Sequence, residues 1–219
     1  VSVVFFITIP ELFFFCAVGL SRIDAYPQVL ALFRKGFYQL ISAHTGTGYS
    51  TIYSPQFVRE WSHLALFGLV AAMSLGGASC STTGAIKLLR IGIIYKALLQ
   101  DITKIILPER AVVLRKFHHI KEIILEDRQV RSALMISLAY ILLYAFGTCL
   151  GMFFGYPLME SLFESTSAAA NVGLSCGITN PAMPWGLKIT YIFQMWAGRL
   201  EFMSIFTLIG FFVAAVKGK

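Results

Sequence analysis

Two short turns rich in glycine and hydroxyl groups are the parts of this chain whose residue types and spacing could do chemistry. The first contains Thr-Gly-Thr-Gly-Tyr at residues 45–49, and the second lies within residues 167–175. Glycine reaches positive φ angles, at which consecutive carbonyl oxygens can turn toward one axis. Rings of such carbonyls replace the hydration shell of potassium in selective pores, where Thr-x-Gly-Tyr is a familiar motif. Neither turn holds a carboxylate, so the expected chemistry is binding of a dehydrated cation by backbone oxygens.

The two turns are equivalent positions of an internal repeat. When residues 42–50 are placed over residues 167–175 without a gap, Ser, Ala, Gly and Ser coincide. Each turn follows a stretch of half-spanning helical length, at 27–41 and 157–166. The negative end of each half-helix dipole would favour a cation at the turn. A helix-start signal, an N-cap residue followed by Pro, comes soon after each turn, at Ser54-Pro55 and Asn180-Pro181.

The elements that carry these turns have the composition of a membrane protein. Of 219 residues, 57% are hydrophobic and 13% are charged, whereas a soluble domain carries about 25% charged residues. The runs 1–20, 63–86 and 132–159 hold at most one charged residue each, and the last exceeds the ~20 residues that cross a bilayer. Backbone amides in hydrocarbon must pair within their own segment, so these runs should be helices. The sequence predicts an all-α polytopic membrane protein and not an enzyme.

The charge distribution sets the expected topology. Ten of the 18 Lys and Arg residues lie between residues 87 and 131, mixed with acids, which is typical of a solvated connector and not of a nucleic-acid-binding surface. The positive-inside rule then places this connector and the carboxyl terminus in the cytoplasm. The half-helices are too short to span, so both should be re-entrant from the outside, as parallel repeats. The predicted division is a first repeat at 1–98, a basic cytoplasmic connector at 99–131 and a second repeat at 132–219.

Two further features lie at membrane depth. Small and polar residues at 76–84 interrupt the apolar run that begins near Phe57. Such a break is tolerated only beside a wet cavity or packed protein, so it is either a mobile plug below the turns or a packing kink. Arg199 lies inside the last apolar run, where charges are costly and face the protein interior. It is either a positive barrier below the turns or the ion-pair partner of Glu201 or Glu11.

These stretches resemble the Trk/Ktr/HKT superfamily of potassium and sodium transporters. The resemblance rests on the two turns, on Gly-Ala-Ile-Lys at 84–87 and on Met-Trp-Ala-Gly-Arg-Leu-Glu at 195–201. It covers nearly the whole chain, which is similar to the third and fourth of four helix–pore-loop–helix repeats in TrkH-type potassium uptake subunits. The chain departs from the family pattern at Cys80 and Ala85, where the family usually has Gly.

The resemblance implies roles for individual residues. Gly48 and Gly173 would be filter glycines, residues 76–87 would be an intramembrane gating loop, and Arg199 would lie opposite that loop. The ion-binding residues that it implies are Thr45, Gly46, Thr47, Gly48, Ala170, Asn171, Val172 and Gly173. The gate residues that it implies are Gly76, Gly77, Ser79, Ser81, Thr82, Gly84, Lys87 and Arg199.

The implied function is transport of potassium or sodium across the plasma membrane, through a carbonyl selectivity filter gated by the intramembrane loop. K⁺ or Na⁺ would be the transported ion, and no cofactor is expected in this chain. Expected partners are the amino-terminal repeats of the same protein, a second copy in a homodimer, a cytosolic nucleotide-binding regulatory subunit and the lipid bilayer. A second interpretation is a two-repeat potassium channel subunit that dimerises to complete four filters. A carrier with inverted repeats and a non-transporting scaffold fit the paired parallel turns less well.

Overall fold

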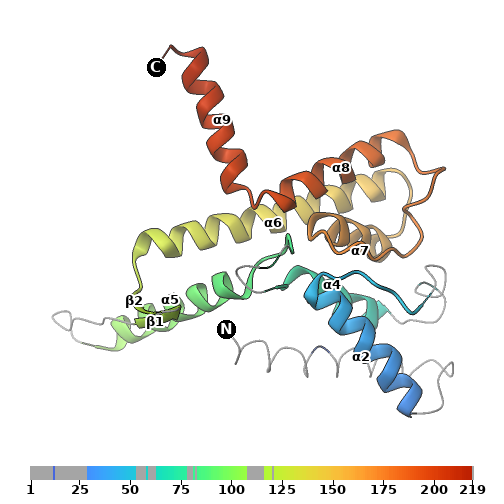
Figure 1. The fold of residues 1–219 in the computed structure, drawn as a ribbon, viewed down its shortest axis with the longest axis horizontal. Helices are drawn as coiled ribbons and strands as arrows, with labels where there is room; N and C mark the ends of the chain where they lie inside the picture. Colours follow the sequence, from blue (N-terminus) through green and yellow to red (C-terminus); the bar gives the residue numbers. More distant parts are fainter. Residues whose placement is uncertain are drawn as a thin grey trace.

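The structure is a computed structural model that describes residues 12, 29–52, 58, 63–77, 81, 83–107, 116–119 and 121–218. Helices α6, α7 and α8 lie side by side, α4 packs against α7 and α2, and α9 projects away from the body (Figure 1). The elements along the chain are α2 (Val29–Thr45), α4 (His63–Ser74), α5 (Leu88–Ile106), β1 (Lys116–His119), β2 (Lys121–Ile124), α6 (Asp127–Phe153), α7 (Leu158–Ala169), α8 (Trp185–Arg199) and α9 (Met203–Val216).

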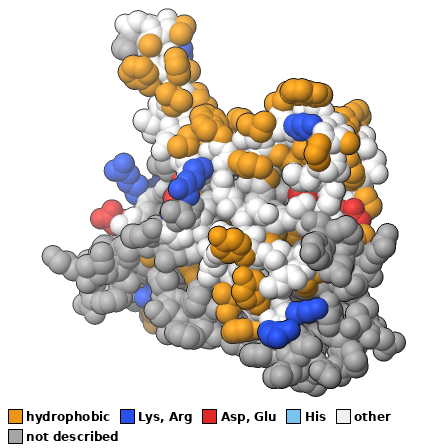
Figure 2. Space-filling view, turned by 45° about the vertical axis from the view of Figure 1, so that its right-hand side comes forward, with side chains coloured by type: hydrophobic (Ala, Val, Ile, Leu, Met, Phe, Trp, Pro, Cys, Tyr) orange, Lys and Arg blue, Asp and Glu red, His pale blue; other side chains and the backbone are white. Residues whose placement is uncertain are grey.

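Among the described residues, α6 alone is long and apolar enough to cross a membrane as one straight helix. Its 27 residues rise by about 40 Å, and its most apolar window has a mean hydropathy of 2.0. Helices α8 and α9 meet the same criteria together, as a bent pair. Leu138, Ile141 and Leu142 on α6 are more than half exposed, whereas Ser137 is buried. Apolar side chains outward and a hydroxyl inward are expected of a helix that faces lipid. Figure 2 shows hydrophobic side chains over much of the described surface, including the projecting α9.

Two half-length helices lead into the two turns. Helix α2 enters the first turn, residues 42–50, and α7 enters the second turn, residues 167–175. Helix α7 contacts α4, α6 and α8, and it is polar for a helix at the centre of a fold. Its buried residues include Ser161, Glu164, Ser165, Thr166 and Ser167. Ser165, Ser167 and Glu164 form side-chain hydrogen bonds with other segments of the chain, so α7 positions its neighbours by polar contacts as well as by apolar packing.

The two repeats share one hydrophobic core. Leu40 of α2, Leu69 of α4, Phe163 of α7 and Leu187 of α8 belong to a single buried cluster. Each of these four side chains is fully buried, and in a membrane such side chains stabilise the helix contacts by van der Waals packing. The shared core fixes the first turn relative to the second.

Glycines allow α6 to approach α7 and α8 closely. A Cβ at Gly147 would overlap Gln194 of α8 and Ser165 of α7, and one at Gly151 would lie 2.7 Å from Ser161 Oγ. The close approach permits polar contacts between helices, because Gln194 Nε2 donates to the carbonyl of Leu143 over 2.7 Å. Small residues at helix contacts are a common device in membrane proteins.

The described fold differs from the sequence expectation in two local respects. Helix α8 begins at Trp185, so the predicted start at Asn180-Pro181 is wrong. Pro184 explains the difference, because a helix begun earlier would lose an amide donor there and the preceding residue is disfavoured in helical conformation. The connector also holds an antiparallel hairpin, β1 with β2, in which Lys116 lies opposite Ile124. Helix α5 crosses the predicted boundary at residue 98, and the three-part division stays a prediction.

Candidate functional site

The first and second turns are closed by the same side-chain hydrogen bond. Ser42 donates through Oγ to the carbonyl of Tyr49 over 2.6 Å, and Ser167 donates through Oγ to the carbonyl of Leu174 over 2.6 Å. Each serine lies in the last turn of its half-helix, and each acceptor lies seven residues farther along the chain. The sequence repeat therefore reflects a repeated contact. The serine recurs because its hydroxyl closes each turn.

The backbone conformation of the two turns is also repeated. Gly46 has a φ of 70° and Asn171, its equivalent, has a φ of 56°. Gly48 and Gly173 have φ angles of 75° and 88°. Asparagine is among the few residues with a side chain that adopt the left-handed region readily. The second turn thus keeps the shape of the first although it has Asn where the first has Gly.

The two turns meet at Gly48. A Cβ at this position would overlap the carbonyl of Val172, so only glycine permits the observed approach. Because Val172 directly precedes Gly173, the central residues of the two turns lie next to each other. The structure therefore brings the predicted ion-binding residues of both repeats together in one place.

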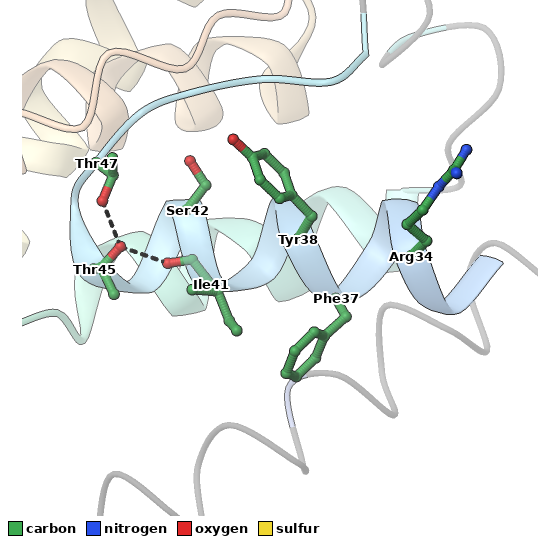
Figure 3. A pocket seen from close by; sticks show the side chains of 7 residues that line it. All are labelled: Arg34, Phe37, Tyr38, Ile41, Ser42, Thr45 and Thr47. Atoms are coloured by element: carbon green, nitrogen blue, oxygen red, sulfur yellow. Dashed lines mark hydrogen bonds between the residues drawn. The ribbon is translucent and has the colours of Figure 1, made fainter. Parts of the chain in front are cut away.

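One side of the first turn faces a groove along α2. The hydroxyl of Thr45 donates to the carbonyl of Ile41 over 2.7 Å and lies 2.8 Å from the hydroxyl of Thr47, as Figure 3 shows. Tyr38 and Arg34 line the same groove farther along the helix (Figure 3). The hydroxyl groups of Thr45 and Thr47 are thus tied to α2. The second turn has Ala170 and Val172 in their places, so these two hydroxyls are not part of the repeat.

Residues 76–87, named the bridging segment, contact both turns at equivalent carbonyls. Thr83 donates through Oγ1 to the carbonyl of Thr45 over 3.1 Å. The adjacent residue, Gly84, donates its N–H to the carbonyl of Ala170 over 3.0 Å. Thr45 and Ala170 occupy the same place in the two repeats. Two neighbouring residues of the bridging segment therefore join the two turns.

Glycines let the bridging segment approach the turns closely. A Cβ at Gly76 would lie 3.1 Å from the carbonyl of His44, and a Cβ at Gly84 would lie 3.0 Å from the carbonyl of Ala169 and 2.8 Å from that of Gly198. His44 and Ala169 are again equivalent in the two repeats. A side chain at Gly84 would have to displace backbone atoms, so the small residues of this segment are explained by close packing.

The other predicted residues of the segment are only partly described. Gly77 has a φ of +74°, and a Cβ there would lie 3.0 Å from Ser81 Oγ. Ser81 Oγ lies 2.7 Å from Thr83 Oγ1, so the two hydroxyls extend the contact that Thr83 makes with the first turn. Ser79 and Thr82 lie outside the described residues.

An ion-pair cluster lies at the end of the bridging segment. Lys87 is buried, with 7% of its surface exposed, and it forms a salt bridge with Glu201. Arg90, in the first turn of α5, forms a second salt bridge with the same carboxylate. The sequence left Arg199 as the candidate partner of Glu201, but these salt bridges come from Lys87 and Arg90. Arg199 is the last residue of α8 and is exposed, and Glu11 lies outside the described residues.

The break between α8 and α9 is backbone in an unusual conformation. Glu201 and Phe202 have φ angles of 54° and 57°, which costs on the order of 1–3 kcal/mol for each residue with a side chain. The ring of Phe202 packs edge-on against Tyr140 at 4.9 Å, and the Tyr140 hydroxyl donates to the carbonyl of Gly198 over 2.8 Å. These contacts, together with the Lys87 salt bridge, hold the break in place.

Comparison with known proteins identifies the family. The sequence profile of the family described as TrkH, cation transport protein, matches residues 1–213. The chain belongs to the TrkH family. It is 33% identical over 194 residues to the uncharacterized cation transporter MJ1485 of Methanocaldococcus jannaschii, which covers 89% of the chain and 38% of that relative. It is 22% identical over 200 residues to the Trk system potassium uptake protein TrkH of Escherichia coli K12, which covers 88% of the chain and 39% of that relative.

The TrkH fold extends over nearly the whole chain. The crystal structure of the potassium transporter TrkH from Vibrio parahaemolyticus matches with a TM-score of 0.74 and 21% identity, over 93% of this chain and 42% of that one. The match confirms the predicted all-α membrane fold, to which the connector adds its small hairpin. The TrkH-family chain spans about two fifths of the length of the relatives that it matches. Membership places it among transport proteins and not among enzymes.

Some residues of the site could not be found from the sequence of this TrkH-family chain. Thr83 was not singled out, because no local pattern separates its hydroxyl from that of Thr82 next to it. Arg90 was missed because it is one of many basic residues that follow the break. Both contacts join residues far apart in the sequence, and no local spacing signals them.

Proposed function

We propose that this TrkH-family chain is the carboxyl-terminal half of a potassium uptake protein, and that potassium passes along the first and second turns and two further turns from preceding repeats. One observation carries the proposal: two turns of the same backbone shape meet where Gly48 lies against the carbonyl of Val172. The greater length of the relatives leaves room for two more repeats. The name of the Escherichia coli relative, a potassium uptake protein, supports potassium as the ion.

The half-helices favour a cation at the turns. Helix α2 ends at Thr45 and α7 ends at Ala169, so both carboxyl ends lie where the turns begin. Each helix end carries about half an elementary negative charge. The carbonyls of residues 45–48 and 170–173 would replace the hydration shell of the ion. K⁺, or Na⁺ as the alternative, is the transported species, and the mechanism uses no cofactor in this chain.

The bridging segment acts as the gate in this proposal. Any movement of residues 83 and 84 away from the turns breaks one hydrogen bond to each turn, at Thr45 and at Ala170. A neutral hydrogen bond contributes about 0.5–1.5 kcal/mol net, so the closed position is held but can be reversed. Arg199 adds a positive charge that raises the barrier to a cation nearby, because charges interact strongly where the effective dielectric is low.

The proposed setting of the protein follows from its charges and its length. It is a multi-pass protein of the plasma membrane with the connector and carboxyl terminus in the cytoplasm, since ten of the 18 Lys and Arg residues lie between residues 87 and 131 and two more lie at the carboxyl terminus. It works as a homodimer in the bilayer with a cytosolic nucleotide-binding regulatory subunit, for which the basic connector is the docking surface. Nucleic acid is not a partner. The proposed division is a first repeat at residues 1–98, the connector at 99–131 and a second repeat at 132–219.

Ion flux through the full-length protein in liposomes tests the proposal. Potassium and rubidium are expected to enter and sodium to be disfavoured, and flux is measured per folded protein. Equal flux of all three ions would refute a filter built from these turns, and no flux of any would refute transport. Selective flux from a protein that holds these two repeats alone would instead support the two-repeat channel subunit that dimerises to complete four filters.

A further inference from the structure

Gln39 and Glu164 are polar side chains of the half-helices to which the proposed function gives no role. Gln39 lies in α2 and Glu164 in α7, each three residues before the serine that closes its turn, Ser42 or Ser167. They are therefore equivalent in the repeat. Gln39 is 0% exposed and Glu164 is 3% exposed. A buried carboxylate is costly unless it is paired or hydrogen-bonded, so its partners must account for its presence.

The carboxylate of Glu164 binds the chain that leaves the second turn. Oε1 accepts hydrogen bonds from Ser175 Oγ at 2.5 Å, from Cys176 N at 3.0 Å and from Thr179 N at 3.4 Å. Oε2 accepts from Thr179 Oγ1 at 2.8 Å. An ionised carboxylate accepts hydrogen bonds only, and this set of partners supplies donors. Hydrogen bonds to a charged acceptor are roughly twice as strong as neutral ones.

Gln39 makes a weaker version of the same contact in the first turn. Ser50, the equivalent of Ser175, has its Oγ 3.5 Å from Gln39 Oε1 and 2.6 Å from the carbonyl of Ile52. Its single proton is therefore directed mainly at Ile52. Both serines also accept an amide from two residues farther on, Ile52 N at 3.1 Å and, in the second turn, Gly177 N at 3.0 Å. The arrangement is repeated, but the acceptor in the first repeat is the neutral amide of Gln39, whereas the second repeat has the carboxylate of Glu164.

Hydrogen bonds act together with the buried side chains of Val172 and Leu174 to hold the chain around Gly173 in place. A Cβ at Gly173 would meet no described atom within 4 Å, and a cavity of about 220 Å³ borders Gly173, Glu164 and Thr179. The chain around Gly173 is fixed by Ser167, which binds the carbonyl of Leu174, and by Glu164, which binds the residues that follow. Serine and glutamate lie three residues apart on α7, so they lie on the same face of the helix.

We propose that Glu164 is a positioning residue for ion selectivity, because its carboxylate holds residues 175–179 and thereby fixes the backbone at Gly173. Gln39 has the same role in the first turn with a weaker contact. This inference rests on the proposed function, since selectivity has meaning only if the turns bind the ion. The role belongs to the acceptor oxygens of Glu164 and not to its net charge.

Variants of the full-length protein separate these possibilities. Glu164→Ala removes every acceptor and is expected to lower the preference for potassium over sodium by about tenfold, which corresponds to about 1.4 kcal/mol. Glu164→Gln keeps an oxygen for Ser175 and Cys176, and its amide N–H can donate to the Thr179 hydroxyl, so it should restore most of that preference. Gln39→Ala should have the smaller effect of the two alanine variants, about twofold.

Glu160→Gln is the matched control for charge. Glu160 lies in the first turn of the same helix and is partly exposed, so this variant removes one negative charge from α7 and leaves the acceptors of Glu164 in place. Its selectivity should equal that of the parent protein. Equal losses in Glu164→Gln and Glu164→Ala, or a loss in Glu160→Gln as large as that in Glu164→Ala, would overturn the positioning role.

Folding is measured alongside flux, by thermal stability of the purified protein. If Glu164→Ala does not fold, Thr179→Val serves instead, because it removes one donor to Oε2 and keeps the shape of the side chain. It should lower selectivity by about threefold, and unchanged selectivity in this variant would refute the proposal. Absence of selective flux in the parent protein would refute the proposed function itself. Selective flux in the parent that persists in every Glu164 variant would refute this inference alone.

Discussion

Replacement of Gly48 by alanine separates two reasons why the first turn needs glycine. The φ of Gly48 is +75°, and a residue with a Cβ in the left-handed region costs about 1–2 kcal/mol. The new Cβ would also overlap the carbonyl of Val172, which would have to move on the order of 1 Å to reach van der Waals separation. The first effect lowers stability, whereas the second also distorts the neighbouring turn.

Gly155 provides a control that has the first effect without the second. Its φ is +88°, and a Cβ there would meet no described atom within 4 Å. Gly155→Ala is therefore expected to lower the free energy of unfolding by about 1–2 kcal/mol and to leave ion preference unchanged. Gly48→Ala should lose at least as much stability. It should also lose potassium preference by about a hundredfold, the scale of effect that a misplacement of about 1 Å can have on a positioned site.

The assay is uptake of rubidium and sodium by liposomes that contain each variant of the full-length protein, normalised to folded protein. Thermal stability is measured on the same samples. If Gly48→Ala keeps its ion preference while both variants lose the same stability, the contact with Val172 has no role in selectivity. A loss of preference in Gly155→Ala as large as that in Gly48→Ala would show that the assay reports general destabilisation.

Three further predictions concern the gate and the topology. Thr83→Val removes the hydroxyl that binds the carbonyl of Thr45 and should raise resting flux about fivefold, the equivalent of about 1 kcal/mol. Thr83→Ser should keep the resting flux, and equal flux in both variants would contradict the contact. Arg199→Ala should raise potassium flux while Glu201 keeps Lys87 and Arg90 as partners, and a fall in flux at preserved stability would refute the barrier. Cysteines placed at positions 21 and 185 should react with an external thiol reagent and one at position 116 should not, and external labelling at 116 would overturn the parallel arrangement.

Local chemistry made the two turns predictable from the sequence. Positive φ angles leave a visible trace because they select glycine or asparagine, as at Gly46 and Asn171. The serines that close the turns, Ser42 and Ser167, also align in the sequence. In both turns the hydroxyl lies seven residues before its acceptor, so the same residue type recurs at the same place. The break at 76–84 was equally visible, since few sequences place so many small polar residues inside an apolar run. In each case the residue type is dictated by geometry within a few residues.

Long-range partners could not be predicted in the same way. Glu201 pairs with Lys87 and Arg90, and the nearer of these is 111 residues away in the sequence. The neighbouring Arg199 was the natural candidate by proximity, but the left-handed backbone at Glu201 redirects the chain just after α8 ends. No spacing rule for a continuous helix applies across that break. The hairpin in the connector was missed because the argument that excludes strands holds only within the hydrocarbon region.

Some positions are structurally equivalent in the two repeats although their residues differ. Such positions are hard to recognise from the sequence. Ser42 and Ser167 are identical, so they align at once, whereas Gln39 and Glu164 differ in charge and do not attract attention. The ungapped alignment makes them equivalent, and their contacts with the hydroxyls of Ser50 and Ser175 show that the equivalence is structural. A neutral amide suffices where the serine has another acceptor close by. A side chain with two well-placed oxygens is found where one residue holds the serine, two amides and a second hydroxyl at once. The two repeats thus share one architecture. Gln39 and Glu164 differ because the second turn is held by more hydrogen bonds from this position than the first.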